Sequence, residues 1–277
     1  MYGAFYHLSG KPFQLTPDPH FFFSGKGYNR AMAYLTYGAH KGEGFIVITG
    51  EIGAGKTMLA NTLAYRLASQ DVVLAQVVST QLNADDMVRM VAIAFGLPQD
   101  NSKAVLLDRV AQFLLACNKQ GKRALLIVDE AQNLPAASVE ELRMLSNYLL
   151  GAKPLLQTFL LGQPEFRKTL QSPELEQLRQ RVIASCHLGP MDSAETRDYI
   201  LHRLQTVGWR GDPSFSVDAF AAIHHYTGGI PRKINVLCDR LMLMGCLDKM
   251  HAFAGKDVAA VIDELQQEFP PAVRRVS

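Results

Sequence analysis

The stretch Gly44-Phe-Ile-Val-Ile-Thr-Gly-Glu-Ile-Gly-Ala-Gly-Lys-Thr57 decides the fold of this chain. Its first six residues form an apolar, β-branched run, which predicts a buried strand over residues 44–49. The remainder matches the pattern G-x-x-x-x-G-K-[ST], and residues 57–69 continue with the apolar spacing of a helix. Such a turn cradles phosphate, because successive backbone N–H groups face one anion and the helix N-terminus adds its positive dipole end. The alternative is a strand–helix turn with a surface lysine.

The residue types in this loop have separate chemical roles. The Lys56 ammonium can reach the β- and γ-phosphates of a nucleotide, and the Thr57 hydroxyl can ligate Mg²⁺. The sequence therefore predicts a binding site for ATP and Mg²⁺. The residues expected to bind the nucleotide are Gly50, Glu51, Ile52, Gly53, Ala54, Gly55, Lys56, Thr57 and Met58.

A second apolar run, Ala124-Leu-Leu-Ile-Val-Asp129-Glu130, ends in two acids. An aspartate at the end of such a strand can hold the Mg²⁺ water shell, so Asp129 is expected to join Thr57 as a metal-site residue. The next residue, Glu130, can orient and polarise water for attack on the γ-phosphate. Gln132 and Asn133 follow and are expected to set the rotamer of Glu130. The alternative is a solvated strand end.

Apolar runs alternate with helical patterns along the first two thirds of the chain, which predicts a parallel sheet covered by helices on both faces. A further helix over residues 30–40, with Asn29 as its N-cap, is expected before the first strand. The five predicted strands are 44–49, 72–78, 124–128, 155–161 and 182–188, and the helices between them are 57–69, 84–95, 104–118 and 138–149.

After residue 190 the strand patterns stop, and a small all-helical part is predicted. In the N-terminal arm, Pro17 and Pro19 exclude a regular helix, and three consecutive phenylalanines indicate that it packs onto the body that follows. The predicted lid helices are 193–206, 217–226, 231–246 and 256–267. The predicted organisation is an arm packed on the core (1–29), an α/β core (30–190), a helical lid (191–268) and a flexible tail (269–277).

Composition excludes several classes of protein. The chain has 277 residues, of which 48% are hydrophobic and 19% charged, so it can bury a sizeable core and is not disordered. No run free of Asp, Glu, Lys and Arg exceeds thirteen residues, which is too short for a membrane span, and no signal peptide is expected. The net charge of +2 gives no basic field for nucleic acid. The scattered cysteines, Cys117, Cys186, Cys238 and Cys246, indicate reduced thiols in a cytosolic protein.

Together with the loop, Val128-Asp-Glu-Ala-Gln-Asn-Leu134 and Gly228-Gly-Ile-Pro-Arg-Lys-Ile-Asn235 resemble the motifs of AAA+ ATPases. Over nearly the whole chain the sequence resembles the ExeA/GspA-type general secretion pathway ATPases, with matching segments at 8–19, 145–147, 162–165 and 178–181. Residues 21–23, 34–37 and 207–209 are similar to the secretion ATPase encoded with exosortase (PEP-CTERM) and exopolysaccharide loci. The resemblance implies a P-loop α/β fold with a C-terminal helical lid.

The resemblance also implies roles that spacing alone does not give. Arg232 resembles the sensor 2 arginine that projects from the lid onto the phosphates; the alternative is a solvated arginine at a helix start. Gln163 stands where the family has its sensor 1 polar group, although Asn or Thr is more usual there. Arg181 stands where AAA+ rings supply an arginine finger to the neighbouring subunit. Its rival is Arg179, and a local ion pair with Glu174 or Glu176 is the remaining interpretation.

The expected reaction is Mg²⁺-dependent hydrolysis of ATP by a homo-oligomeric ring. By resemblance, its energy serves a cell-envelope secretion or exopolysaccharide export system, through inner-membrane components met from the cytoplasmic side without membrane insertion. Kinase chemistry on the same loop is one alternative, and two more come from other classes of protein. One is an ATPase of the transposition-helper type that acts on DNA, against which the small net charge argues. The other is a switch that binds nucleotide and turns over little, against which the pair Asp129 and Glu130 argues.

Overall fold

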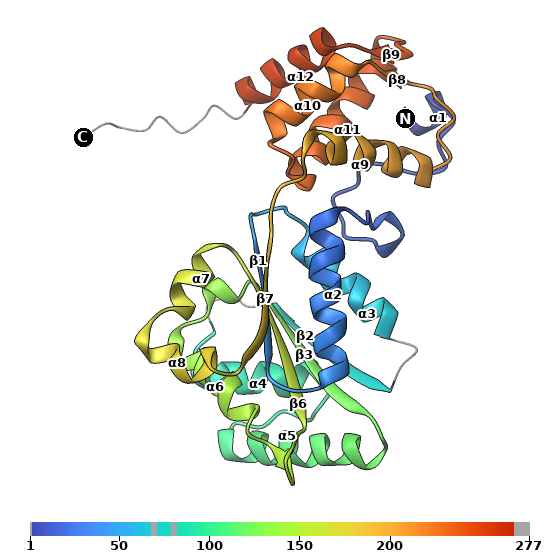
Figure 1. Cartoon of the computed structure of the whole chain (residues 1–277). Coiled ribbons are helices and arrows are strands. Elements are labelled where there is room, and N and C mark those ends of the chain that lie inside the picture. The colour runs from blue at the N-terminus through green and yellow to red at the C-terminus, as the bar shows by residue number, and fades with distance from the viewer. Residues whose placement is uncertain (1, 68–70, 79–81, 269–277) are drawn as a thin grey trace, which may run out of the picture. The chain divides into compact units, whose positions relative to one another are not determined.

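The structure is a computed structural model that describes residues 2–67, 71–78 and 82–268. Its contacts divide the chain into two compact units (Figure 1). Unit 2, the larger one, comprises residues 26–52 and 56–189, and unit 1 comprises residues 1–25, 53–55 and 190–277. The predicted tail, 269–277, lies outside the described residues.

Unit 2 is built on a five-stranded parallel sheet in the order β2-β3-β6-β1-β7. Every residue of β1 and β6 is buried, which explains why these strands are mainly apolar and lack the regular apolar–polar alternation of a half-exposed strand. The predicted fold class, an α/β P-loop fold with a five-stranded parallel sheet and a C-terminal helical part, is confirmed. The strands are β1 (Phe45–Gly50), β2 (Val72–Val78), β3 (Arg123–Asp129), β6 (Leu156–Gly162) and β7 (Val182–Leu188).

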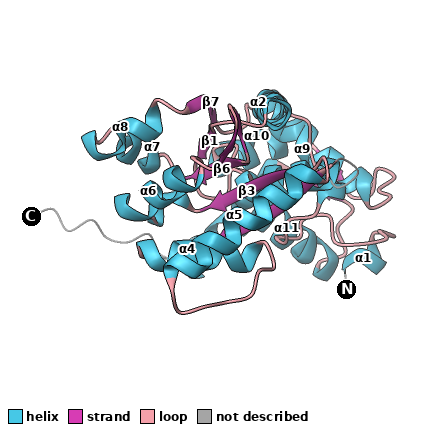
Figure 2. Ribbon diagram, turned by 90° about the horizontal axis from the view of Figure 1, so that it is seen from below, coloured by secondary structure: helices cyan, strands magenta, loops and turns pink. Residues whose placement is uncertain are grey.

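Helices cover both faces of this sheet (Figures 1 and 2). On one face lie α2 (Lys26–Lys41) and α3 (Lys56–Leu67), which contact β1. On the other face, α4 (Ala84–Ala94), α5 (Lys103–Lys119) and α6 (Ala136–Leu145) enclose a large apolar core with the strands. The helices therefore hold the carboxyl ends of β1, β3 and β6 in fixed positions, and Asp129, Glu130 and Gln163 lie at the ends of β3 and β6.

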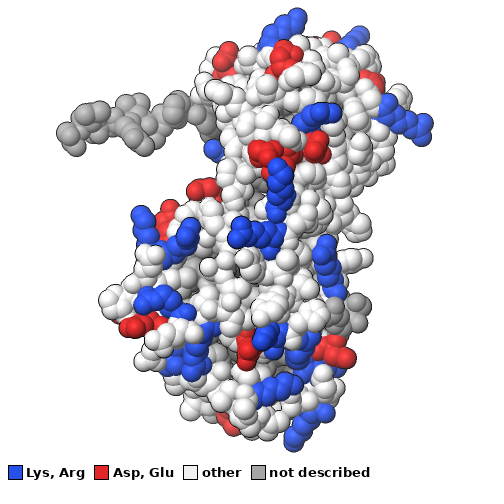
Figure 3. Space-filling view, viewed as in Figure 1, with Lys and Arg blue, Asp and Glu red and all other residues white. Residues whose placement is uncertain are grey.

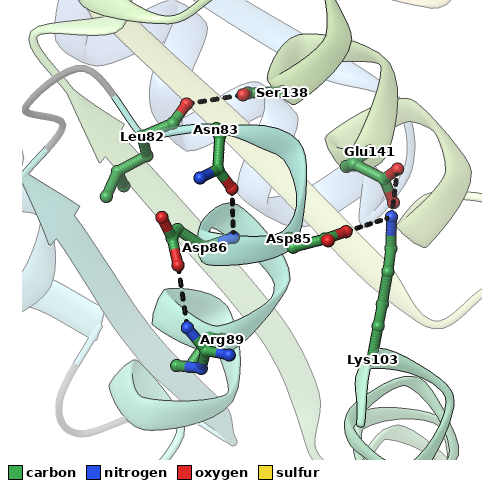
Figure 4. A network of polar contacts seen from close by, with 8 residues as sticks. All are labelled: Leu82, Asn83, Asp85, Asp86, Arg89, Lys103, Ser138 and Glu141. Atoms are coloured by element: carbon green, nitrogen blue, oxygen red, sulfur yellow. Dashed lines mark hydrogen bonds and ion pairs between the residues drawn. The ribbon is translucent and has the colours of Figure 1, made fainter. Parts of the chain in front are cut away.

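A polar network ties α4, α5 and α6 together (Figure 4). Lys103, the first residue of α5, contacts Asp85 Oδ1 at 3.1 Å and Glu141 Oε1 at 2.7 Å. The Ser138 hydroxyl of α6 donates to the Leu82 carbonyl at 2.6 Å. Because the Lys103 and Asp85 side chains are partly solvated, each ion pair contributes at most about 1 kcal/mol. Apolar packing supplies most of the stability of this layer, and the network fixes the register of the three helices.

Unit 1 has a core of its own, formed largely by helices after residue 190. Aromatic side chains of the arm, Tyr2, Tyr6 and Phe13, are buried in that core. Two short strands also pair there, although no strand is predicted in this part. The elements of unit 1 are α1 (Tyr2–Phe5), η1 (Pro19–Phe21), α9 (Ser193–Thr206), β8 (Ser214–Phe215), α10 (Val217–Thr227), α11 (Pro231–Leu247), β9 (Ala252–Phe253) and α12 (Gly255–Glu268).

The placement of the arm corrects the prediction that it packs on the α/β core. Residues 2–25 pack within unit 1, against the helices that follow Pro190. The anchor is the buried side chain of Arg203 in α9. It donates to the backbone carbonyls of Pro12 and Gln14 in the arm, the latter at 3.1 Å. Its guanidinium also lies 4.6 Å from the centre of the Phe21 ring. The sequence of the arm indicates that its aromatic residues are buried, but it does not indicate which distant helix they pack against.

Some other boundaries differ from the prediction. Helix α2 begins at Lys26, so Asn29 lies inside the helix and is not its N-cap. The segment between β3 and β7 also holds short elements that the apolar pattern is too brief to indicate. They are η2 (Ala131–Asn133), β4 (Leu149–Leu150), β5 (Lys153–Pro154), α7 (Glu165–Leu170), η3 (Pro173–Leu175) and α8 (Glu176–Arg179).

Two glycines of α2 have opposite surroundings, which allows its packing to be tested. A Cβ on Gly38 would overlap Ile46 Cδ1, which is fully buried, whereas a Cβ on Gly27 would meet nothing within 4 Å. We expect Gly38→Ala to lower the free energy of unfolding by about 1–3 kcal/mol through overpacking. Gly27→Ala is expected to change it by less than about 1 kcal/mol. Urea unfolding followed by circular dichroism measures both, and equal values would contradict the packing of α2 on β1.

Candidate nucleotide site

Lys56 is the first residue of α3 and its side chain is held back against the loop. The Nζ atom donates to the carbonyls of Gly50 at 2.8 Å and Glu51 at 3.1 Å. Burial lowers the pKa of this ammonium, an effect that the neighbouring carboxylates of Glu130 and Asp129 oppose. The side chain is therefore a positive charge with little water around it, in the position where the sequence pattern expects a phosphate contact.

Thr57 and Asp129 are brought together from positions 72 residues apart. The Thr57 hydroxyl donates to Asp129 Oδ2 at 2.7 Å, and Asp129, the last residue of β3, is almost fully buried. A hydroxyl beside a carboxylate oxygen is a donor set that suits a small hard cation such as Mg²⁺. These two residues therefore fit the predicted metal site.

Glu130 has a left-handed backbone, with φ 55° and ψ 38°, directly after β3. Its Oε2 accepts hydrogen bonds from the Gln132 side-chain amide at 2.6 Å and the Gln163 side-chain amide at 3.2 Å. Within the described residues its Oε1 accepts none, so one carboxylate oxygen is anchored and the other is available to a ligand. Non-glycine residues in this conformation carry strain, which is often found at active sites. This contact is consistent with the predicted influence of Gln132 on the Glu130 rotamer, which stays a prediction.

Gln163 connects the ends of two neighbouring strands. It follows the last residue of β6, and its backbone N–H donates to Gln132 Oε1 at 2.8 Å while its side chain contacts Glu130. The three residues thus form a closed set of hydrogen bonds in which both glutamines use their amide groups. The sequence places Gln163 beside the site only through the resemblance, and the sheet order, with β6 next to β3, explains its position.

The two candidate finger arginines lie away from this cluster. Arg181 precedes β7, so it stands at the opposite end of the parallel strands from Lys56 and Asp129. Its guanidinium donates to Ser146 Oγ at 2.9 Å, and Arg179 donates to the Leu170 carbonyl at 3.1 Å. In the described part of the chain neither forms the ion pair with Glu174 or Glu176 that was the alternative to a finger role. The Ser146 contact has no signal in the sequence, because it joins segments 35 residues apart.

Arg232 belongs to unit 1 and is the second residue of α11. Its side chain is exposed, and its backbone N–H donates at 3.2 Å to the carbonyl of Gly53, which is grouped with the same unit. Gly53 has φ +79°, a conformation that favours glycine. The role of the Arg232 guanidinium as a phosphate sensor is therefore a proposal that its exposure permits.

One polar pair beside the loop is missed in the sequence. Thr49, the residue before Gly50, contacts His187 through Thr49 Oγ1 and His187 Nδ1 at 3.1 Å. The two residues are register partners on β1 and β7. Thr49 and His187 are 138 positions apart in the chain, so the pair could have been predicted only if β1 and β7 were known to be neighbours.

Comparisons with known proteins agree with this geometry. A family model described as an AAA domain matches residues 39–170. The chain is 35% identical over 267 residues to General secretion pathway protein A of Aeromonas hydrophila. That alignment covers 96% of this chain and 48% of the relative, so the chain spans about half the length of the curated protein it matches.

Solved structures share the fold at low sequence identity. The ADP form of the ORC2 protein of Aeropyrum pernix has a TM-score of 0.69 at 17% identity, covering 93% of this chain and 73% of that one. Cdc6p of Pyrobaculum aerophilum has a TM-score of 0.66 at 16% identity, with 90% and 71% covered. The RuvB Holliday junction branch migration motor of Thermotoga maritima has a TM-score of 0.60 at 20% identity, with 87% and 70% covered.

The loop with its lysine, the Thr57–Asp129 pair and the anchored Glu130 all lie at the carboxyl ends of the strands of one parallel sheet. By their sequence positions, these residues all fall within residues 39–170, the region that matches the AAA domain. The chain therefore has the α/β fold and the site geometry of a P-loop ATPase, and its residues 39–170 are similar to an AAA domain.

Proposed function

We propose that this chain hydrolyses ATP with Mg²⁺ at the site formed by Lys56, Thr57, Asp129 and Glu130. The observation that carries the proposal is the anchoring of Glu130 Oε2 by two amide donors, which fixes the carboxylate without neutralising it. A fixed carboxylate can act as a general base toward water. Mg²⁺ held by Thr57 and Asp129 would offset charge on the phosphates.

In this proposal the nearby polar groups assist the base and the phosphates. Gln163 orients Glu130 and the attacking water, and Lys56 neutralises the β- and γ-phosphates. Arg232 contacts the phosphates when nucleotide is bound, because an exposed guanidinium forms charge-assisted hydrogen bonds with them. The loop residues Gly50 to Met58 bind the phosphates through their backbone N–H groups.

The cellular role that we propose is an ATPase of the GspA type, which powers or regulates secretion across the cell envelope. The support is the 35% identity to General secretion pathway protein A over 96% of this chain. A finer assignment, to an exosortase-linked or exopolysaccharide export system, rests on the sequence resemblance. No helix in the described residues has the length and apolarity to cross a bilayer. On the basis of the similarity to General secretion pathway protein A, we propose that the protein acts at the cytoplasmic side of the inner membrane through protein partners.

The test of the activity is the release of phosphate from ATP with and without Mg²⁺. Turnover that needs Mg²⁺ and disappears in Lys56→Ala supports the proposal. Absence of turnover with nucleotide binding intact would favour a nucleotide-occupancy switch. Stimulation by duplex DNA that falls steeply with salt would favour the DNA-linked alternative, and identical rates in wild type and Lys56→Ala would assign the activity to a contaminant.

Oligomerisation is tested by mixing two variants. If Arg181 acts on a neighbouring subunit, Arg181→Ala and Glu130→Gln should each lose most turnover, by roughly 10³-fold for a finger. Their mixture should recover part of it, because the Glu130→Gln subunit supplies Arg181 to an intact site beside it. The same mixture made with Arg179→Ala identifies which arginine is used. Full activity of Arg181→Ala alone, or a mixture that stays inactive, would contradict this role of Arg181.

A further inference from the structure

A cavity of about 300 Å³ lies in unit 2, apart from the nucleotide site. Its walls come from β1 and β7 at the edge of the sheet and from α7 and α8, which pack beside them. None of Lys56, Thr57, Asp129 and Glu130 lines it. The cavity therefore needs an explanation of its own.

The polar groups that line this cavity are suited to an anion. Arg167 of α7 and Arg179 of α8 both line it, and no acidic side chain does. In the described part of the chain the Arg167 side chain forms no hydrogen bond or ion pair, and the Arg179 side chain uses one N–H on the Leu170 carbonyl. Figure 3 shows Lys and Arg side chains over α7 and α8 on this face. Two guanidinium groups with free N–H donors thus face the same space.

Further donors come from the sheet. Ser185 and His187 on β7 and Thr49 on β1 line the cavity, and the Thr49–His187 contact uses only Nδ1 of the imidazole. A phosphate has three terminal oxygens and about two negative charges, so it can engage two guanidinium forks and hydroxyl donors together. A monocarboxylate needs only one guanidinium group, which donates two parallel hydrogen bonds to its two oxygens. The donor set therefore favours phosphate over a simple carboxylate.

The remaining wall is apolar and indicates the size of the ligand. Val47, Leu170 and Val182 contribute to it. A volume of about 300 Å³ is larger than a bare anion needs and falls at the lower end of pockets that hold small organic ligands. The occupant should carry a neutral body of a few carbon atoms beside its charged group.

We propose that this cavity binds a small phosphorylated molecule at a second site, separate from the nucleotide. Two elements that line the cavity, β1 and α7, are adjacent in sequence to residues of the nucleotide site. Thr49 is followed by Gly50 of the loop, and α7 begins two residues after Gln163, which contacts Glu130. A ligand between β1 and α7 therefore contacts the two elements whose ends carry these groups.

The experiment is calorimetric titration of the full chain with glycerol 3-phosphate, in the presence of saturating ADP and without Mg²⁺. ADP binding is recorded first, so a failure of the nucleotide site is seen separately. We expect wild type to bind glycerol 3-phosphate at one site. The double variant Arg167→Gln/Arg179→Gln should lose roughly tenfold or more in affinity, since hydrogen bonds to charged groups are removed. Both side chains are exposed, so folding should be retained.

The matched control is Lys168→Gln, which changes the exposed neighbour of Arg167 on α7 that does not line the cavity. It should leave the affinity within about twofold, since only a distant charge is lost. A double variant that binds as tightly as wild type would overturn the proposal, as would no binding of glycerol 3-phosphate to wild type at 10 mM added ligand. A second experiment tests whether the phosphate group belongs to a lipid headgroup. It measures co-sedimentation of the protein with phosphatidylcholine vesicles, with and without phosphatidic acid. Binding only to vesicles with phosphatidic acid, lost in the double variant, would assign the phosphate to a lipid.

Discussion

Glu130→Gln is expected to lower turnover of ATP by about 10²-fold or more while ATP affinity changes little. General base catalysis contributes typically 10²–10⁴-fold, and an amide cannot accept the proton of the attacking water. The substitution keeps the size and planar shape of the side chain, so the contacts with Gln132 and Gln163 can partly persist. Single-turnover phosphate release and equilibrium binding of a fluorescent ATP analogue measure the two quantities separately.

The control for this variant is Glu174→Gln, which removes an exposed carboxylate of η3 that lies outside the nucleotide site. Its turnover should match that of wild type. If Glu130→Gln binds ATP normally and hydrolyses it as fast as wild type, Glu130 is not the base. A loss of binding and turnover together would instead indicate that the substitution disturbs the loop.

Arg203→Met is expected to destabilise unit 1 by about 3 kcal/mol. The methionine keeps much of the apolar stem, but the carbonyls of Pro12 and Gln14 and the Tyr199 hydroxyl lose their donor inside the core. A buried polar group left without its partner costs about 1–3 kcal/mol, and relief from burying the guanidinium charge offsets part of the sum. The arm should consequently detach before the helices unfold.

Trp209 provides the measurement, because it is the single tryptophan of the chain and lies in unit 1. Urea unfolding followed by its fluorescence reports this unit, and limited proteolysis reports release of residues 2–25. Arg197→Met, an exposed position on the same helix, should leave the transition within about 0.5 kcal/mol of wild type. Equal midpoints for the two variants would show that Arg203 does not anchor the arm.

The nucleotide loop could be predicted because its signal is local. The strand, the glycine-rich turn and the helix follow one another within residues 44–69, and each has its own pattern. The same holds for Asp129, which ends an apolar run. The order of the strands then brings Thr57 to Asp129 and Gln163 to Glu130, and this order follows from no local pattern.

Features that depend on distant contacts could not be predicted. The aromatic residues of the arm indicate that it is buried, but they do not indicate which part of the protein buries it. The arm was therefore expected on the α/β core. Its true contact depends on Arg203, about 190 residues later, an arginine that the sequence gives no reason to place in a core. The left-handed conformation of Glu130 is likewise unexpected for a non-glycine residue, since it is imposed by the surroundings of the site.

The packing of residues 2–25 with residues after 190 has a consequence for synthesis on the ribosome. The arm emerges before its helical partners, which follow only after about 165 more residues, and this takes on the order of ten seconds or longer. During that time Tyr2, Tyr6 and Phe13 lack their native partners among the helices after residue 190, while the sheet of unit 2 can already form. The nascent chain should therefore present an early aromatic segment to chaperones, and folding of unit 1 should finish last.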